Sequence, residues 1–241
     1  MRVVVVGATG RLGQLVVAEA ARGGLTAVPI GRGGDLDGAI ALDAADTVVV
    51  DVATPGSTAA HVAVCVRHKV PLVVGTTGLS AADVSAIDDA AASIPLLVAA
   101  NLSPGAHLVA LLSGLAAKAM PEADVEIVEV HHRKKKDAPS GTALLLARAV
   151  EQARGGARVV RSRDGDAPRQ PGDIGVVAVR GGDVVGEHTV SFFVDGERVE
   201  LVHKVSDRAI FARGALQAAR FLSGKPAGRF LMTDVLQASI G

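Results

Sequence analysis

The chain has 241 residues, of which 49% are hydrophobic and 21% charged, and this composition indicates one or two folded domains and excludes a disordered chain. Its 25 Lys and Arg balance 25 Asp and Glu, and five Phe are its only aromatic residues of the Phe, Trp and Tyr class. A nucleic-acid binder normally carries a basic surplus and stacking aromatics, so we expect no nucleic-acid partner. A strand begins at Arg2 and no apolar run approaches a membrane span, so we expect no signal peptide, no membrane insertion and a cytoplasmic location.

The first part of the chain alternates short apolar segments with helical patterns. Strands are predicted at 3–6, 26–30, 47–52, 72–74 and 96–99. Helices are predicted at 12–21, 58–68 and 81–92, with Ser57 and Ser80 as caps. This alternation is typical of βαβ units on a parallel sheet. We therefore predict an α/β fold with a Rossmann-type dinucleotide-binding domain over residues 1–103.

A glycine-rich turn follows the first strand. Gly7, Gly10 and Gly13 separate the Val3 to Val6 run from the next helical pattern. Glycines permit a tight turn and close backbone approach, and the first amides of a helix attract a pyrophosphate. A turn used only for packing is the alternative, but the strand before it and the helix after it favour a dinucleotide. We therefore predict NADPH and/or NADH as the cofactor.

The end of the second strand usually decides between NAD and NADP, because an acid there binds the ribose and an Arg accepts the 2′-phosphate. Gly31 occupies the position of the acid, and Arg32 follows directly. Arg32 favours NADPH, although Asp35 or Asp37 could swing back from the glycine-rich loop. Two further loops, 75–78 and 99–103, follow predicted strands at the edge of the sheet where ligands bind.

The second part of the chain has a different pattern. A helix at about 107–120, a strand at 125–130 and a helix at 142–154 precede a polar stretch, 155–173, that we expect to be a loop. Strands at 174–179, 184–194 and 198–205 are joined by short turns, which indicates an antiparallel meander. We predict an α+β substrate and oligomerisation domain over residues 104–208 with a mixed, largely antiparallel sheet. The remaining segment, 209–241, contains a helix at 209–223 and is expected to pack back on the first domain.

Six consecutive basic or imidazole side chains, residues 131–136, lie between the strand at 125–130 and a helix start. Asp137 and Ser140 are both plausible caps, and Pro139 suits the first helical turn. The amides of Gly141 and Thr142 would then point, with the positive end of the helix dipole, at an anion. A solvated basic face is the alternative, but the neutral chain and the strand-to-helix position favour a carboxylate or phosphate site.

The single cysteine, Cys65, lies in an apolar segment and is predicted to be a buried structural thiol. We expect no metal site.

The motif H-H-x-x-K-x-D-A-P-S-G-T, from His131 to Thr142, resembles that of the dihydrodipicolinate reductase family, also called 4-hydroxy-tetrahydrodipicolinate reductases. The resemblance extends to the glycine turn and to residues 75–78, 179–189, 203–204, 208 and 211–215. It implies hydride reduction of a small cyclic dicarboxylate by NADH or NADPH in lysine and diaminopimelate biosynthesis. It also implies a homotetramer formed by joining the antiparallel sheets.

The resemblance further implies the roles of individual residues. It places acid/base chemistry on His131, a catalytic lysine at Lys135, substrate contact on His132, and carboxylate binding on the amides of Gly141 and Thr142. Protonated Lys135 suits a carboxylate and charge left on the ring as hydride arrives, and an imidazole transfers protons near neutral pH. Lys134 and Lys136 receive no role beyond attracting anions. The implied cofactor contacts, with Arg32 added for the 2′-phosphate, are Gly7, Ala8, Thr9, Gly10, Arg11, Leu12, Gly75, Thr76, Thr77, Ala99, Ala100, Asn101 and Leu102.

Two alternatives remain open at this point. A nonenzymatic dinucleotide sensor would keep the glycine turn but would need no ordered His-His-x-x-Lys before a helix. A related two-domain dehydrogenase would act on another small amino or keto acid. Turnover, and the substrate that supports it, separates these two hypotheses from the reductase.

Overall fold

The computed structural model describes residues 1–239 and divides into two compact units, which are described separately below. The first unit contains Met1–Pro104 and the chain from Arg208 onward, and the second contains Gly105–Asp207. Among the residues described, no helix is both long and apolar enough to cross a membrane.

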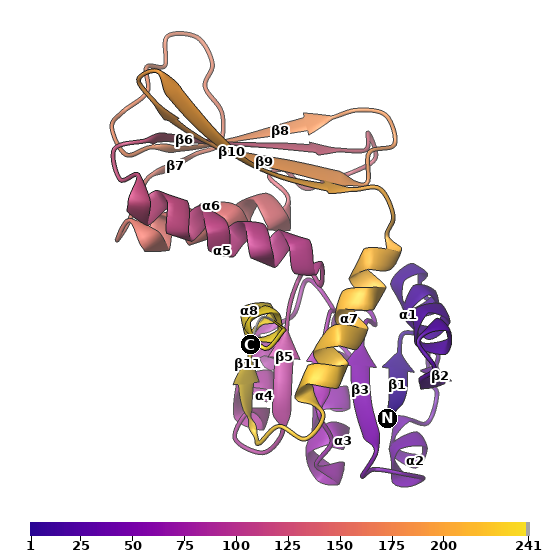
Figure 1. Cartoon of the computed structure of the whole chain (residues 1–241). Coiled ribbons are helices and arrows are strands. Elements are labelled where there is room, and N and C mark those ends of the chain that lie inside the picture. Colours follow the sequence, from indigo (N-terminus) through magenta and orange to yellow (C-terminus); the bar gives the residue numbers. More distant parts are fainter. Residues whose placement is uncertain (240–241) are drawn as a thin grey trace. The chain divides into compact units, whose positions relative to one another are not determined.

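A parallel sheet of six strands forms the centre of the first unit, in the order β11-β5-β4-β3-β1-β2. Its strands are β1 (Arg2–Val6), β2 (Thr26–Ile30), β3 (Thr47–Asp51), β4 (Leu72–Val74), β5 (Pro95–Val98) and β11 (Gly228–Phe230). Its helices are α1 (Arg11–Arg22), α2 (Leu36–Ala41), α3 (Thr58–His68), α4 (Ala81–Ala90), α7 (Ala209–Leu222) and α8 (Met232–Gln237). The Rossmann-type parallel sheet predicted from the strand rhythm is confirmed (Figure 1).

The valines of β1 are buried because helices cover both faces of the sheet. Val3 and Val5 pack with side chains of α1, α7 and α8, whereas Val4 and Val6 pack with side chains of α2, α3 and α4. A strand buried on both faces is expected to be continuously apolar, as this one is. Cys65 lies in the second of these cores with 0% exposure, which confirms the buried thiol, and burial raises its pKa.

Several local features of this unit differ from the sequence prediction, which contained neither β11 nor α8. Helix α2 was not predicted, because glycines interrupt its short pattern; Asp35 caps it by accepting from the amide of Gly38 at 2.8 Å. The Ser57 hydroxyl caps nothing and donates instead to the carbonyl of Thr54 at 3.0 Å. The predicted cap Ser80 is confirmed, since its hydroxyl accepts from the amide of Asp83.

The second unit has a mixed sheet of five strands in the order β10-β9-β6-β8-β7. They are β6 (Asp124–His131), β7 (Val159–Val160), β8 (Ile174–Arg180), β9 (Gly186–Val194) and β10 (Glu197–Val205). The predicted meander is correct only for β9 and β10. Strand β6 lies between β8 and β9, parallel to the first and antiparallel to the second, because it contributes hydrogen-bonding groups at both of its edges.

Helices α5 (Pro104–Ala119) and α6 (Gly141–Ala153) supply apolar side chains to the core on one face of this sheet (Figure 1). Strand β6 alternates strictly, with Val125 and Ile127 buried against the helices and Asp124, Glu126 and Val128 on the opposite face. Continuing the same alternation places Glu129 and His131 on the helix-covered face. Both are buried.

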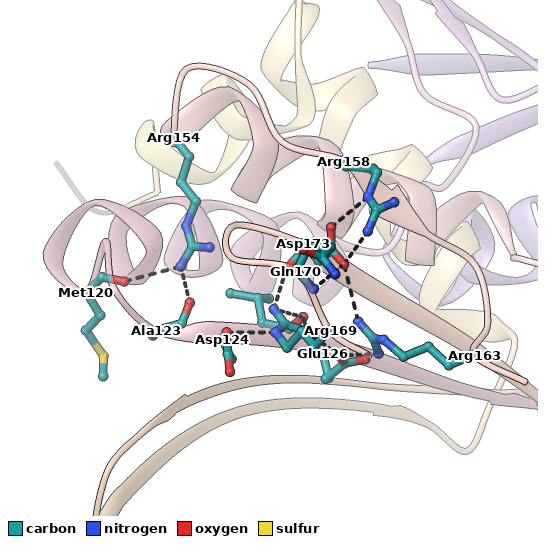
Figure 2. A network of polar contacts seen from close by, with 11 residues as sticks. Met120, Ala123, Asp124, Glu126, Arg154, Arg158, Arg163, Arg169, Gln170 and Asp173 are labelled. Atoms are coloured by element: carbon teal, nitrogen blue, oxygen red, sulfur yellow. Dashed lines mark hydrogen bonds and ion pairs between the residues drawn. The ribbon is translucent and has the colours of Figure 1, made fainter. Parts of the chain in front are cut away.

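The long segment 155–173 is fixed by ion pairs, as Figure 2 shows. Buried Asp173 accepts two hydrogen bonds of 2.8 Å from Arg158, and Glu126 of β6 pairs with Arg163 and Arg169. The predicted loop contains one short strand, β7, which pairs with β8. The segment that the sequence predicts to be a loop is therefore held against the sheet by the ion pairs of Arg163 and Arg169 with Glu126.

Candidate active site

The six basic residues lie where β6 ends and turns toward α6. The amide of His132 donates to the carbonyl of Val184 at 2.7 Å, and the amide of Arg133 donates to the carbonyl of Gly182 at 3.3 Å. The connection between β8 and β9 therefore holds the backbone at the start of the loop through these two hydrogen bonds. His131 itself is paired across the sheet with Arg180 of β8.

One buried carboxylate organises the residues around this loop. Glu129, with 0% exposure, contacts His131 Nδ1 through Oε2. Its Oε1 accepts from the backbone amide of Ser140 at 3.0 Å and from the Arg180 guanidinium at 2.8 Å. Arg180 also donates to the carbonyl of Asp137 at 2.7 Å. Strand β6, strand β8 and the start of α6 therefore meet at a single side chain.

Burial and charge act in opposite directions on the two central groups. Burial lowers the pKa of His131, while the neighbouring Glu129 carboxylate opposes that change. Burial acts to raise the pKa of Glu129, but hydrogen bonds from Arg180 and Ser140 outweigh it, so its pKa is lowered. Glu129 is therefore an anion near neutral pH, next to an imidazole that can exchange a proton.

Lys135 is held by an acidic neighbour. Its Nζ lies 2.8 and 2.7 Å from the two carboxylate oxygens of Asp137, and the lysine side chain is only 19% exposed. The hydrogen bond from Lys135 lowers the pKa of Asp137. Asp137, which the sequence offered as a possible helix cap, is thus the counter-ion of Lys135.

The start of α6 is capped by the second of the two candidates. Ser140 Oγ accepts from the amide of Ala143 at 3.1 Å, and the helix begins at Gly141. Pro139 precedes the cap, so its predicted place in the first turn is wrong: the cap position falls one residue later, at Ser140. The amides of Gly141 and Thr142 belong to the first turn of α6, as predicted, where a helix favours an anion.

Three histidines of neighbouring strands lie in a row beneath the loop. The ring of His188 on β9 is 5.2 Å from that of His131 and 5.8 Å from that of His203. His188 Nε2 lies 3.2 Å from Ser140 Oγ, and burial lowers the pKa of His188 to about 3, so it is neutral. Ligand atoms of Glu129, His131 and His188 lie within 4.8 Å of one another, but the Arg180 guanidinium on the same carboxylate disfavours a cation.

Glu129, Arg180 and His188 were not among the site residues predicted from the sequence. One signal was present for Glu129. In β6 it occupies the phase of Val125 and Ile127, and a charge at a core position is costly unless it is paired. No comparable signal marked Arg180 in the sequence, because its partner Glu129 is brought next to it only by the pairing of β8 with β6. His132, which was predicted, is half-buried beside the loop, and its Nδ1 has no hydrogen-bond partner among residues 1–239.

The glycine turn of the first unit is a close-packed backbone structure. Gly7 has φ of +83°, and a Cβ on it would lie 2.7 Å from the Cα of Ala53. A Cβ on Gly13 would lie 2.7 Å from the Cα of Ala8. Helix α1 begins directly after Gly10, with Arg11 and Leu12 in its first turn and Thr9 accepting from Gln14 at 3.1 Å. The turn and helix end fit a pyrophosphate.

The loops after β3, β4 and β5 meet this turn at one edge of the sheet, because the strands are parallel neighbours. Thr76 is buried, and its hydroxyl lies 3.2 Å from Asp51 Oδ1, which also accepts from the amide of Ala53 at 3.0 Å. Asp51 thus ties two of the loops together, and the Thr76 side chain is occupied by that contact. A Cβ on Gly75 would lie 2.7 Å from Leu102 Cδ1.

The predicted cofactor residues after β5 differ in how they face solvent. Ala100 is exposed, Ala99 is buried, and Asn101 Oδ1 accepts from the amide of Ser103 at 2.7 Å. Leu102 is 2% exposed and belongs to the core. Its side chain therefore packs inside the unit, and its carbonyl lies against α7 at Gly214.

The two acids that compete with Arg32 in the sequence are both engaged elsewhere. Asp35 caps α2, and Asp37 pairs with Arg67 and with His68 Nε2, the latter at 3.0 Å. Arg32 is exposed in the loop after β2, and no hydrogen bond or ion pair holds it within residues 1–239.

This fold and this site define the class: a two-unit α/β oxidoreductase with a dinucleotide-type unit and a second unit in which buried Glu129 holds His131. Family models described as the N-terminus and the C-terminus of dihydrodipicolinate reductase match residues 26–102 and 105–236. The chain belongs to the dihydrodipicolinate reductase family. The predicted family and the predicted oxidoreductase class are thereby confirmed.

Curated relatives agree with the family models. The chain is 42% identical to the 4-hydroxy-tetrahydrodipicolinate reductase of Zymomonas mobilis, with 98% of this chain and 97% of the relative covered. The corresponding reductase of Nitrosomonas eutropha is 40% identical over 98% of each chain. A solved dihydrodipicolinate reductase from Paenisporosarcina, with dipicolinate bound, has a TM-score of 0.80 at 23% identity and covers 96% of this chain and 97% of its own. That last likeness concerns the fold.

Proposed function

We propose that this chain reduces 4-hydroxy-tetrahydrodipicolinate to tetrahydrodipicolinate with hydride from NADPH or NADH, in lysine and diaminopimelate biosynthesis. The observation that carries the proposal is the single loop that joins His131, Lys135 and the start of α6 around Glu129. The full-length relatives are reductases of this name, and a structural neighbour binds dipicolinate.

The loop offers two places for a dicarboxylate. Lys135 supplies a cation, and the amides of Gly141 and Thr142 supply the positive end of a helix dipole. We assign His132, whose carbonyl accepts from the amide of Lys135 at 3.1 Å, to substrate contact. A substrate carboxylate at Lys135 would replace Asp137, which occupies the ammonium group here and is itself 61% exposed and able to move away.

We assign the proton chemistry to His131. Its Nδ1 is turned toward Glu129, so its other ring nitrogen, Nε2, is the one available to exchange a proton with the ring. Lys135 stabilises negative charge left on the substrate as hydride arrives. At an effective dielectric near 20, a charge pair about 4 Å apart is worth roughly 4 kcal/mol, which is enough for a large rate effect.

The residues of the first unit fit a dinucleotide, because the close-packed turn at Gly7 and Gly13 leads directly into the first amides of α1 at the edge of the parallel sheet where ligands bind. When bound, the reduced nicotinamide supplies the hydride. We assign the pyrophosphate to residues 7–12, further cofactor contacts to residues 75–77, and the backbone of residues 99–102 to the same ligand. We infer a preference for NADPH from Arg32, because the two acids that could bind the ribose instead, Asp35 and Asp37, are engaged in other contacts.

We also propose a cytoplasmic homotetramer joined through the sheets of the second units. On the face of this sheet opposite the helices, Val177, Val128, Thr189 and Val202 are neighbours across four strands. The three valines are exposed by 41%, 38% and 48%, and Val179 and Phe193 extend the same face. An exposed apolar face of this kind is typical of an oligomer interface. Light scattering tests it, and a monomer mass would contradict it.

The activity is tested by NADPH and NADH oxidation, with substrate generated freshly from pyruvate and aspartate semialdehyde by the preceding synthase. We expect turnover that depends on the synthase. Cofactor binding without turnover would instead support the dinucleotide sensor. Turnover of aspartate semialdehyde or similar acids, with none of the heterocycle, would support another dehydrogenase.

A further inference from the structure

We propose that Glu129 is a positioning residue, which holds the acid/base side chain of His131 and the anion-binding start of α6 in one fixed arrangement, with Arg180 as its counter-ion. This inference deepens the proposed function and rests on it for the role of His131. It assigns a task to two residues, Glu129 and Arg180, that lie outside the motif's histidines and lysine.

The geometry of the carboxylate supports this role. One oxygen faces His131 Nδ1, and the other accepts from the Ser140 amide at 3.0 Å and from Arg180 at 2.8 Å. Ser140 is the cap of α6, so the group that aligns the imidazole also fixes the residue from which Gly141 and Thr142 follow. A shift of Glu129 would move the proton-transferring group and the carboxylate site together.

Stability alone does not account for a carboxylate at this position. Val125 and Ile127 precede it on the same face of β6, and a buried ion pair is often no more stable than apolar residues of similar volume. The cost of burying this charge is offset by three partners on three segments of the chain. An aliphatic residue would fill the space but would leave His131 Nδ1, Arg180 and the Ser140 amide without their acceptor.

A glycine opposite His131 completes the arrangement. With Nδ1 turned to Glu129, Nε2 is directed to Gly186 of β9, where a Cβ would lie 3.0 Å from Nε2. A side chain at this position would crowd Nε2, and glycine avoids that contact. The carboxylate therefore selects which ring nitrogen exchanges the proton, since a hydrogen bond at one nitrogen determines the state of the other.

Three charged groups face His131, namely Glu129 of β6, Lys135 of the loop and Arg180 of β8. The neutral ring of His188 on β9 also lies against it. Burial lowers the pKa of His131, and the cations of Lys135 and Arg180 lower it further, whereas Glu129 raises it. Removing the negative charge of Glu129 must therefore lower that pKa. The protonated imidazole would then be lost at a lower pH, so the alkaline limb of activity moves to lower pH.

The test compares Glu129→Gln and Glu129→Asp with Glu126→Gln in the full chain. Glu126 is a matched control, because it lies on the same strand and also pairs with arginines, but on the opposite face of the sheet. We expect Glu129→Gln to lower kcat on the order of 10-fold to 100-fold, with an unchanged KM for NADPH and an alkaline limb at lower pH. Glu129→Asp should recover part of kcat, and Glu126→Gln should keep the wild-type pH profile.

A second readout separates this proposal from the proposed function. The His131 imidazole is titrated by NMR of 15N-labelled protein without substrate, and Glu129→Gln should lower its pKa and change its tautomer. This titration decides on Glu129 even if the wild-type chain reduces no substrate. If Glu129→Gln does not fold, Glu129→Asp decides: wild-type kcat and a wild-type His131 titration in every folded Glu129 variant would overturn the inference.

Discussion

Two segments of this molecule share the order strand, loop and helix start, but one loop is shaped by backbone packing and the other by side-chain contacts. In β1–α1 the loop is made of backbone: Gly7 and Gly13 pack so closely that neither position accepts a Cβ. In β6–α6 the loop is made of side chains: Glu129 holds Arg180 and His131, while Lys135 is held by Asp137.

The difference follows from what each segment has to do. A pyrophosphate needs only amides and close approach, so a rigid glycine turn is sufficient. Proton transfer and stabilisation of developing charge need ionisable groups at fixed positions. The first segment therefore tolerates little change of shape, and the second tolerates little change of charge. The predictions below test that contrast.

The largest expected effect is on charge in the second segment. Lys135→Ala should lower kcat about a hundredfold, which corresponds to roughly 3 kcal/mol of transition-state stabilisation. Binding of NADPH, measured by fluorescence titration, should stay at the wild-type level. Lys136→Ala is the matched control and should stay close to wild type. Normal turnover in Lys135→Ala would remove the proposed role of this lysine.

The next effect is on shape in the first segment. Gly7→Ala should weaken NADPH binding on the order of tenfold, because the left-handed φ costs about 1–3 kcal/mol and the new methyl meets the backbone of Ala53. Isothermal titration calorimetry measures it. Gly24→Ala is the control: its φ is +68° with nothing within 4 Å, so it should lower Tm without changing cofactor affinity. Equal affinities in the two variants would contradict the crowding argument.

A smaller effect is expected at Arg32, which is exposed. Arg32→Ala should lower the ratio of kcat/KM for NADPH to kcat/KM for NADH by about threefold to tenfold, because an exposed ion pair contributes roughly 1 kcal/mol. The NADH value in the same variant is the internal control. An unchanged ratio would show that another group reads the 2′-phosphate.

The smallest effect on activity is expected at Asp173, which precedes β8 at the end opposite to Arg180. Hydrogen bonds from Arg158 lower the pKa of Asp173 to about 2, so the stability it contributes is present above pH 4 and is lost as the pH falls toward 2. Asp173→Asn should lower Tm at pH 7 with little loss of kcat, and its Tm should change less than that of wild type between pH 5 and pH 3. Thermal denaturation followed by circular dichroism measures this. Asp164→Asn, an exposed carboxylate in the same segment, should match wild type.

The two units also differ in how much of their fold could be predicted from the sequence. Five of the six strands of the first unit were predicted nearly to their ends, since a continuous valine run such as β1 suits only a strand covered on both faces. The sixth, β11, was not predicted, because its three residues form a strand only by pairing with β5. The order of strands in the second unit was not predicted either. Sequence neighbours β8 and β9 look like a hairpin, and nothing local shows that β6 lies between them.

The glycine turn after a buried strand, and the imidazoles and lysines before a helix, could be predicted because both motifs consist of residues adjacent in the chain. The partners of those residues could not, because they come from distant parts of the chain. Glu129 meets Arg180 only through the pairing of β6 with β8, and it meets the cap of α6 only because that helix packs on the same face. Buried charge is stable only with such partners, and partners distant in the chain are assembled by folding.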